Sequence, residues 1–397
     1  MKSIKALKFW SIMLGTLTSF MVLQAQESQQ NIRLHFAAMV GEQMATCAET
    51  YADVSASQAN IRFNDFRFYV SNIQLLTAEG EAVALQLEQD GMWQYENVAL
   101  LDFENGEAGC SEIGNQALNG VIIGSAPEAD YVGVRFDLGV PFELNHLDVT
   151  AASSPLNIAA LWWNWQGGYK FARIDLVTDA PEHQAWNIHL GSTGCVSPAG
   201  AIAPKEPCAR PNITRIYFDA FDFDQQVIVL DLAALLTDVP LYENTLMPPG
   251  CMSGVDDPDC PTLFANLGLS LNEGICTEEN CASQKLFRLS DITSVTLVER
   301  TEMSAQMHIS EGMQHHHDHG SQTASITLDE ATAIQIALDR YPDTNVVESK
   351  SGMAYGVQVW DIELSNGVSI EIDQSNGEIV EISGAGEDWE NPLYSND

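Results

Sequence analysis

The chain has 397 residues, 45% of them hydrophobic, which is enough for packed cores in two or three domains and excludes global disorder. Its net charge of −38 opposes binding to nucleic acid, because carboxylates and phosphates repel each other. Such a charge suits an acidic secreted protein, or one that attracts cations or a basic partner.

The first 25 residues, Met1 to Ala25, have the three parts of a secretory signal peptide. Three lysines precede an apolar run over residues 9–23, and Leu-Gln-Ala stands before the expected cleavage site. The run is short for a membrane span, and no cysteine follows it that could carry a lipid. We therefore expect a periplasmic or secreted protein without a stable membrane anchor.

Residues 26–300 are expected to form one mainly β domain. Short alternating or apolar runs, broken by Gly, Pro, Asn and Asp, predict strands at 32–36, 63–76, 131–138, 169–177, 186–190, 213–221 and 227–232. Such spacing is typical of a sandwich or barrel of antiparallel strands. Helical character is confined to 232–236 and 261–267, each long enough for a turn or two.

Eight cysteines follow the expected signal peptide, and an even number in an oxidising compartment predicts disulfides. Spacing does not fix the connectivity. The short separations favour Cys195 with Cys208, Cys251 with Cys260, and Cys276 with Cys281, which leaves Cys47 for Cys110. A zinc or thiolate-copper site is the alternative, although the chain has no Cys-x-x-Cys.

Half of the eight tryptophans, Trp162, Trp163, Trp165 and Trp186, lie between His146 and His189. Imidazole binds copper, zinc, iron and nickel, and an electron-rich indole beside the metal favours a cuprous ion most. Strand alternation puts Trp163 and Trp165 on one face and Trp162 on the other.

His35 and Met39 are weaker additional candidates for metal ligands. The competing interpretation of this whole region is that the histidines are structural and the tryptophans are ordinary packing residues. Lys170 and Arg173 are expected to form surface ion pairs, for example with Asp175.

A segment over residues 301–323 is rich in methionine and histidine, and it holds five of the nine histidines: His308, His315, His316, His317 and His319. Thioether and imidazole suit cuprous and cupric ions, so the composition predicts a flexible linker that sequesters metal. A solvated tether with incidental histidines has equal weight, and nickel or zinc would also bind such a tract.

Residues 324–388 predict a small α+β module. A helix over 328–341 follows Thr327, with Glu330 three residues later as in a capping box. Strands are expected at 345–350, 357–364, 368–372 and 379–382, with tight hairpins at Asn366-Gly367 and Asn376-Gly377. Leu-Asp-Glu-Ala-Thr-Ala, Trp-Asp-Ile-Glu-Leu and Ile-Asp-Gln-Ser-Asn-Gly-Glu-Ile resemble the PepSY domain, whose members bind or restrain partner proteins.

Four motifs in the first domain together resemble one family. They are Asp-Phe-Arg-Phe-Tyr-Val-Ser-Asn from residue 65, Gly-Val-Pro-Phe-Glu-Leu-Asn-His from residue 139, Trp-Trp-Asn-Trp-Gln-Gly-Gly-Tyr-Lys-Phe from residue 162, and His-Leu-Gly-Ser-Thr-Gly-Cys from residue 189. Over residues 32–271 the chain is similar to periplasmic copper proteins related to the methanobactin-associated MbnP, also called metallo-mystery pair four-Cys motif proteins.

The resemblance implies a copper site with His146 and His189 as ligands. It also implies a partner, a diheme enzyme similar to MauG, which oxidises a tryptophan of the copper protein to kynurenine. Trp163 and Trp165 are the first candidates for that change and Trp162 is the third. One departure is Leu161, where family members often carry a methionine, so a thioether ligand is missing there.

The sequence therefore predicts a disulfide-stapled antiparallel β-sandwich that holds copper, followed by a PepSY module. We expect a protein of copper homeostasis that is not an enzyme and that exchanges copper with donor or acceptor proteins. No common hydrolase or nucleotide-binding motif is present. The alternatives are a secreted glycan- or peptide-binding interaction module with structural histidines, and a redox enzyme acting on a small substrate.

Overall fold

The computed structural model describes residues 28–110, 116–149, 151–164, 167–181, 185–197, 203–243, 248–301, 328–341, 344–354, 357–365, 368–374 and 379–383. The expected signal peptide, the linker histidines, Trp165 and the two Asn-Gly turns lie outside these ranges. Within the described ranges, no helix is long and apolar enough to cross a membrane.

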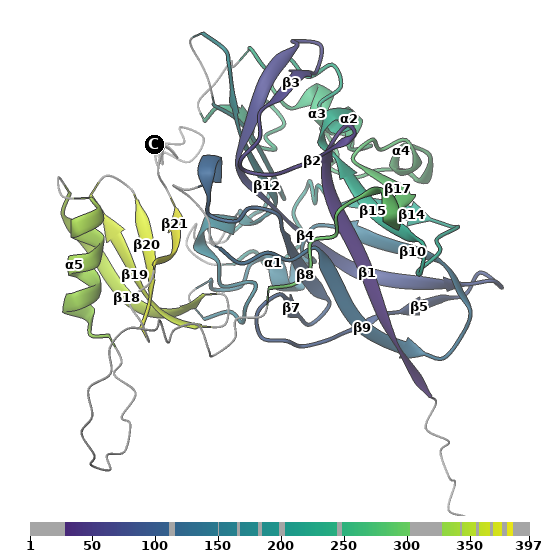
Figure 1. Ribbon diagram of the computed structural model, residues 1–397, viewed down its shortest axis with the longest axis horizontal. Coiled ribbons are helices and arrows are strands. Elements are labelled where there is room, and N and C mark those ends of the chain that lie inside the picture. Colours follow the sequence, from purple (N-terminus) through teal and green to yellow (C-terminus); the bar gives the residue numbers. More distant parts are fainter. Residues whose placement is uncertain are drawn as a thin grey trace, which may run out of the picture.

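Two sheets make up the part of the chain before residue 302 (Figure 1). The six-stranded sheet runs in the order β17 (Phe287–Asp291), β15 (Gln226–Asp231), β1 (Gln29–Val40), β9 (Val121–Pro127) and β6 (Gln86–Leu87), and β2 (Gln43–Met44) pairs with β1. The eleven-stranded sheet runs in the order β14 (Thr214–Phe218), β10 (Tyr131–Leu138), β4 (Ala59–Thr77), β12 (Gly168–Thr178), β13 (Ala185–Gly191) and β16 (Gly250–Cys251).

Shorter elements complete this part of the fold. The remaining strands of the larger sheet are β3 (Tyr51–Val54), β5 (Ala82–Ala84), β7 (Gln94–Tyr95), β8 (Val98–Asp102) and β11 (Trp162–Asn164). The helical turns are η1 (Ala108–Cys110), α1 (Phe142–Asn145), η2 (Ala159–Leu161), α2 (Leu232–Leu235), α3 (Pro261–Asn266), α4 (Glu278–Ala282) and η3 (Ile292–Ser294). The mainly β prediction is confirmed, although the β1–β15 and β13–β16 pairs are parallel rather than antiparallel.

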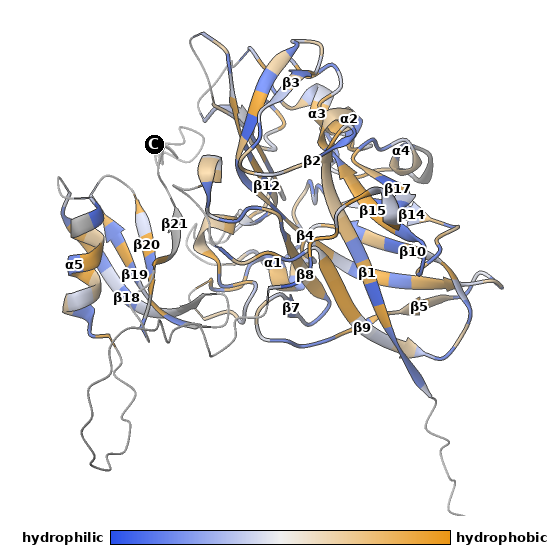
Figure 2. Ribbon diagram, in the orientation of Figure 1, coloured by the Kyte–Doolittle hydropathy of each residue, from blue (hydrophilic) through white to orange (hydrophobic). Residues whose placement is uncertain are grey.

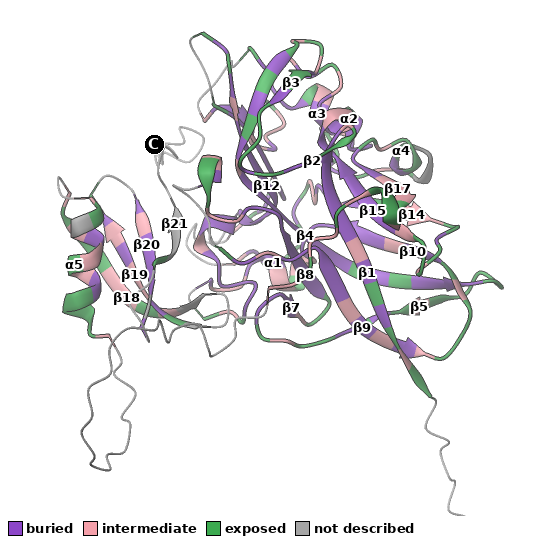
Figure 3. Ribbon diagram, viewed as in Figure 1, coloured by how far each residue is buried: buried purple, intermediate pink, exposed green. Residues whose placement is uncertain are grey.

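Aromatic side chains join the two sheets across a single core. Phe136 of β10 lies edge-on to Phe36 of β1, at 5.6 Å between ring centroids, and to Phe287 of β17, at 5.2 Å. Phe68 of β4 contacts Phe287 as well. Because burial of such rings removes a large apolar area from water, these contacts hold the two sheets face to face. The strands rich in hydrophobic residues in Figure 2 are largely those that are buried in Figure 3.

In the 19-residue strand β4, the edges are paired by β10, β12 and β8, and residues 65–71 are all buried, so both faces are covered there. Phe66 and Phe68 point into the core, whereas the alternating residues Asp65 and Arg67 point to the opposite, outer face and are also buried. The outer face of this sheet therefore differs in chemistry from its inner face.

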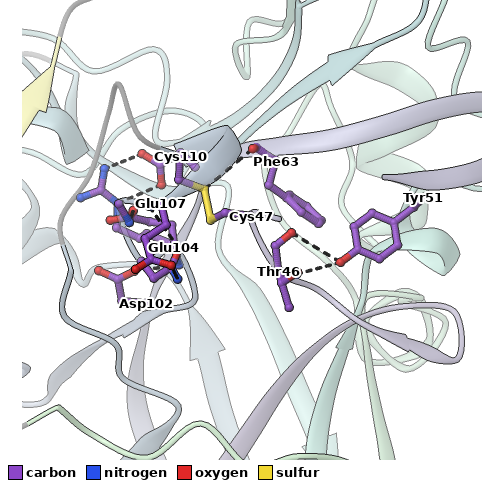
Figure 4. Close-up of a disulfide and its surroundings, with 12 residues drawn as sticks. Thr46, Cys47, Tyr51, Phe63, Asp102, Glu104, Glu107 and Cys110 are labelled. Carbon is purple, nitrogen blue, oxygen red and sulfur yellow. Dashed lines mark hydrogen bonds and ion pairs between the residues drawn. A yellow bond between two sulfur atoms is a disulfide. The ribbon is translucent and has the colours of Figure 1, made fainter. Parts of the chain in front are cut away.

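All four disulfides that the short separations favoured are present: Cys47–Cys110, Cys195–Cys208, Cys251–Cys260 and Cys276–Cys281. Figure 4 shows the first of them with Tyr51, which turns its hydroxyl toward Thr46. The Thr46 N–H donates to that hydroxyl at 2.8 Å, and the hydroxyl donates to the Met44 carbonyl at 2.7 Å. Four disulfides indicate an extracytoplasmic protein, because cytosolic thiols are kept reduced.

The C-terminal module consists of α5 (Glu330–Arg340) and a four-stranded antiparallel sheet, β18 (Val346–Ala354), β19 (Val357–Leu364), β20 (Ser369–Asp373) and β21 (Ile379–Ser383), in that order. Ala333 and Ala337 of the helix pack with Ile362 and Ile370 of the sheet in a core of their own. The helix begins later than predicted, since its N-cap is Asp329 and not Thr327. The carboxylate of Asp329 accepts the N–H of Thr332 at 2.9 Å.

The disulfides are expected to stabilise the fold in proportion to the chain that they enclose. Cys47–Cys110 spans 63 residues and Cys276–Cys281 spans 5. Replacing both cysteines of the longer loop with serine should lower the free energy of unfolding by about 4 kcal/mol, against about 2 kcal/mol for the shorter loop. Urea denaturation monitored by circular dichroism measures both values. Equal losses in the two double variants would contradict this ranking.

Candidate metal site

The outer face of the eleven-stranded sheet carries buried charges in place of apolar side chains. The strands β4, β12 and β13 are neighbours there, and Arg173 stands opposite Arg67 on one side and His189 on the other. Six polar side chains of these strands are at most 5% exposed: Asp65, Arg67, Lys170, Arg173, Asp175 and His189. We call these six residues the buried charge cluster. Buried charges are tolerated only when they are paired and hydrogen-bonded, so their partners decide the local structure.

Arg173 is shared between the two carboxylates of the cluster. Asp65 accepts from Arg67 Nε at 2.8 Å, forms a second contact with Arg67 Nη2, and lies 3.0 Å from Arg173 Nε. Asp175 Oδ2 lies 2.8 Å from the same Arg173 Nε. Burial raises the pKa of Asp175, but the charges of Arg173, His189 and Lys170 together outweigh burial and hold that pKa below its usual value. The carboxylate therefore stays ionised.

A β-bulge places both cations of β12 on this face. The pairing with β13 shifts register between Lys170 and Ala172, so that Lys170 and Arg173, three residues apart, lie on the same side. Lys170 Nζ and Arg173 Nη1 donate to the carbonyl oxygen of Ala160 in η2, at 3.1 Å and 3.0 Å. The expected ion pair of Arg173 with Asp175 is confirmed. Its expected location at the surface is wrong, because the segment that contains η2 covers both Lys170 and Arg173.

His189 is held by the cluster through one nitrogen. Its Nε2 lies 2.7 Å from Asp175 Oδ1, and an ionised carboxylate can only accept, so Nε2 carries the proton. In the neutral imidazole the lone pair is then on Nδ1. The His189 carbonyl accepts from the Ser253 hydroxyl at 2.9 Å, and the Gly191 N–H donates to that hydroxyl at 3.1 Å. These contacts fix the strand on which the imidazole sits.

Trp163 lies against the strand that carries His189. A Cβ atom added at Gly191 would stand 2.4 Å from Cζ3 of the Trp163 ring, so only glycine leaves room for the indole. Gly191 and His189 are two residues apart and share one face of β13, about 7 Å apart along the strand. Trp162 packs against the main core, whereas Trp165 is outside the described residues. The structure describes both Trp162 and Trp163, and Trp163 is the one that contacts β13, the strand that carries His189.

His146 follows α1 and is 7% exposed. Its ring lies edge-on to Phe142 at 5.3 Å, and its Nε2 is 3.5 Å from Cys208 Sγ and 3.3 Å from Asn145 Nδ2. Because Asn145 Oδ1 accepts the N–H of Tyr169 at 2.9 Å, the amide NH2 of Asn145 faces the imidazole and donates to it. The lone pair of His146 is therefore on Nε2.

The register of β12 orders these three residues. Asn145, next to His146, packs on Gly168 at the start of β12, where a Cβ atom would stand 2.4 Å from the Asn145 carbonyl. Gly191, which supports Trp163, pairs with Lys170, and His189 pairs with Arg173 farther along. Along β12 the contacts therefore run from Asn145 at Gly168, through the Gly191 that supports Trp163, to His189 opposite Arg173.

Two groups of potential ligand atoms lie close together, but each contains a disulfide. His146 lies with Cys195 and Cys208, and Asp257 lies with Cys251 and Cys260, each group with its atoms within 4.8 Å of one another. The sulfurs are bonded to each other and offer no thiolate. Asp257 accepts the N–H of Met252 at 2.8 Å, so its carboxylate closes a turn of its own chain.

The structure does not bring His35 and Met39 to this face. Alternation along β1 directs Leu34 and Phe36 into the main core, and it directs His35 and Met39 to the outer face of the other sheet. Met39 packs there with a separate apolar cluster that includes Val229. Burial lowers the pKa of His35. The negative charge of Glu299 raises this pKa by a smaller amount, and the positive charge of Arg33 lowers it further.

Sequence reasoning did not identify the buried charge cluster. The signal was present, because Asp65 and Arg67, and likewise Arg173 and Asp175, alternate with large apolar residues in the two longest strand-like runs. Alternation of this kind shows that the two faces differ, and a charged face is usually solvated. Only the fold shows that the segment with Pro155, Leu156 and Ala160 covers this charged face.

Comparison with known proteins gives matches for both parts of the chain. A family model described as MbnP matches residues 29–253, and one described as peptidase propeptide and YPEB domain, PepSY, matches residues 327–382. Among solved structures, MbnP from Methylosinus trichosporium is 30% identical, with a TM-score of 0.58, over 67% of this chain and 99% of that chain. No curated protein matches.

The contact between Gly191 and Trp163 can be tested by adding one methyl group. Gly191→Ala places a Cβ atom 2.4 Å from the indole and 2.8 Å from the Tyr169 carbonyl, so the indole must move. We expect a loss of about 1–3 kcal/mol in the free energy of unfolding and altered tryptophan fluorescence. Gly352→Ala is the control, since nothing lies within 4 Å of its added Cβ, and it should change stability by less than about 0.5 kcal/mol. Identical fluorescence and stability in both variants would refute the contact.

Proposed function

Because the chain belongs to the MbnP family and carries a PepSY domain, we propose that it is a periplasmic or secreted copper-binding protein of a copper homeostasis system. In this proposal the protein is not an enzyme. It holds one copper ion with His146 and His189 and exchanges it with copper donor or acceptor proteins. Four disulfides agree with function in an oxidising compartment.

The main support is the hydrogen bonding of the two buried imidazoles, together with the contact of Trp163 with β13, the strand that carries His189. Asp175 holds the Nε2–H of His189, and a carboxylate behind an imidazole is the usual way to orient a ligating histidine. His189 would therefore ligate through Nδ1. The Nε2 lone pair of His146 accepts from Asn145 Nδ2, so copper would displace this hydrogen bond in order to bind there. Neutral imidazole suits copper.

Trp163 is proposed as the tryptophan that a MauG-like diheme partner oxidises. Cleavage of its indole ring would leave an aryl amine and a ketone, which are nitrogen and oxygen donors, beside the strand that carries His189. Trp162 is a poorer candidate because it packs against the main core. Before oxidation, the indole offers a cuprous ion only its π face.

The linker and the C-terminal module extend this proposal. The linker histidines and methionines would sequester copper and deliver it to the buried site. The PepSY domain would bind the partner protein, as members of that family bind or restrain other proteins. The net charge of −38 favours a partner with a basic docking surface.

Copper stoichiometry tests the proposed ligands. The linker histidines His308, His315, His316, His317 and His319 should first be replaced with alanine, so that only the buried site is counted. This background should retain about one copper per chain after dialysis, as two imidazole ligands and a buried site predict. His146→Ala or His189→Ala should weaken copper binding at least about tenfold, a loss of about 1.4 kcal/mol or more, and so lower the copper retained after dialysis.

The matched control is His35→Ala, which removes a histidine from the outer face of the other sheet and should leave the copper content unchanged. Elemental analysis on folded protein measures the copper content of the background and of every variant. Retention of copper by the doubly substituted His146→Ala, His189→Ala protein would remove these residues as ligands and favour an interaction module with structural histidines.

Peptide mapping by mass spectrometry tests the oxidation. After co-expression with a diheme MauG-like enzyme from the same genome, the peptide that contains Trp163 should carry the mass of kynurenine, and Trp162 should remain unmodified. Trp163→Phe should abolish the modification without creating it elsewhere. A kynurenine found only at Trp165 would reassign the site, and unmodified tryptophans in copper-loaded protein would reject the oxidation altogether.

A further inference from the structure

A groove of about 860 Å³ lies on the first domain, lined by strands β4, β5, β6, β10 and β14. β14, β10 and β4 pair in that order, and β5 pairs with β4, so the groove follows one end of the eleven-stranded sheet (Figure 1). None of the proposed copper ligands lines it. Its volume falls in the range of small-molecule sites.

One row of polar side chains crosses the groove as a continuous hydrogen-bonded chain. Asn97 Nδ2 donates to Asn72 Oδ1 at 2.7 Å, and Asn72 Nδ2 donates to Asp137 Oδ2 at 3.0 Å. Arg215 Nε then donates to Asp137 Oδ1 at 2.8 Å. Each group is oriented by its neighbour, so the row is preorganised before a ligand arrives.

Backbone geometry at Asn72 supports this arrangement. Asn72 has a φ of +52°, in the left-handed region that asparagine tolerates better than most residues, and the register of β4 with β10 shifts there. This shift brings Asn72 into line with Asp137 and Arg215 across three strands. Strain of this kind is commonly kept where a side chain has a specific role.

A second row contains the aromatic group. Tyr217, Arg135 and Gln74 are direct cross-strand neighbours on β14, β10 and β4. The Arg135 guanidinium lies 5.3 Å from the centroid of the Tyr217 ring. On the opposite wall, Gln89 accepts the N–H of Glu96 at 2.7 Å, which fixes the loop before β8. The groove thus combines amides, a guanidinium and an aromatic ring.

The charges that line the groove cancel, although the chain as a whole carries −38. Among the residues that line the groove, Arg135 and Arg215 equal the carboxylates Asp137 and Glu96 in number. Arg215 pairs with Asp137 at 2.8 Å, whereas Arg135 pairs with Asp219, outside the groove lining, at 3.1 Å. Amide, guanidinium and carboxylate groups bind vicinal hydroxyls in pairs, and a tyrosine ring covers an apolar C–H surface. A neutral ligand that is rich in hydroxyls and has such a surface is an oligosaccharide.

Peptides that add to a sheet need an exposed strand edge, and β14 is the edge strand of this sheet. Tyr217, Arg135 and Gln74 instead form a row across the face of the sheet, which suits a sugar ring better than an added strand. From these observations we propose that the groove between β14, β10, β4 and β6 binds a short neutral oligosaccharide. This binding is independent of the proposed copper site and would localise the protein on a glycan.

Calorimetric titration of the full secreted chain with cellotetraose, maltotetraose and N-acetylchitotetraose tests the proposal. At least one of these neutral sugars should bind with saturation. Tyr217→Ala and Asn72→Gly should each weaken that binding about tenfold, equivalent to about 1.4 kcal/mol. Glycine accepts the left-handed backbone at position 72, so this variant should fold normally.

Tyr242→Ala is the matched control, because Tyr242 is an exposed tyrosine outside the groove whose hydroxyl donates to Asp179. It should bind the sugar as the unmodified chain does. Copper content should be the same in all of these variants, which separates this result from the test of the metal site. Failure of all three sugars to bind at millimolar concentration, or unchanged binding by Tyr217→Ala and Asn72→Gly, would overturn the proposal.

Discussion

Pairing of buried charges on the outer face of β4 and β12 is the interaction on which the site depends. Arg67 and Arg173 could not be buried without Asp65 and Asp175, because an uncompensated buried charge costs about 3–5 kcal/mol. The same carboxylate that neutralises Arg173 also fixes the proton of His189. The same hydrogen-bonded network therefore neutralises the buried arginines and orients a proposed ligand, His189.

The cover over this face is held by the strands beneath it. Arg173 and Lys170 bind the Ala160 carbonyl, and the hydroxyl of Tyr69 donates to the Pro155 carbonyl at 2.8 Å. Tyr169 donates to the carbonyl of Leu156 in the same way. Because this segment leads directly into β11, its attachment decides where Trp163 meets β13. The cover has little regular secondary structure, yet Pro155, Leu156 and Ala160 each accept a hydrogen bond from the sheet.

Period-two alternation was sufficient to predict the long strands, and short separations were sufficient to predict three of the disulfides, because both depend on local spacing. The fourth, Cys47–Cys110, followed by elimination. Alternation along one strand does not show which of the two sheets the strand joins. It therefore could not show that His35 lies on a different sheet from His189. Alternation also could not predict the burial of Lys170, because the segment that covers this side chain has no periodic pattern. Thr327 and Asp329 both suit an N-cap, and packing of the helix selects Asp329.

We propose that copper binds between His146 and His189, beside Trp163. Anomalous X-ray scattering at the copper edge, from crystals of the copper-loaded chain with its linker histidines replaced, locates the ion directly. We predict one strong peak within bonding distance of His189 Nδ1 and His146 Nε2. A peak at His35, or at no histidine of the first domain, would contradict the account.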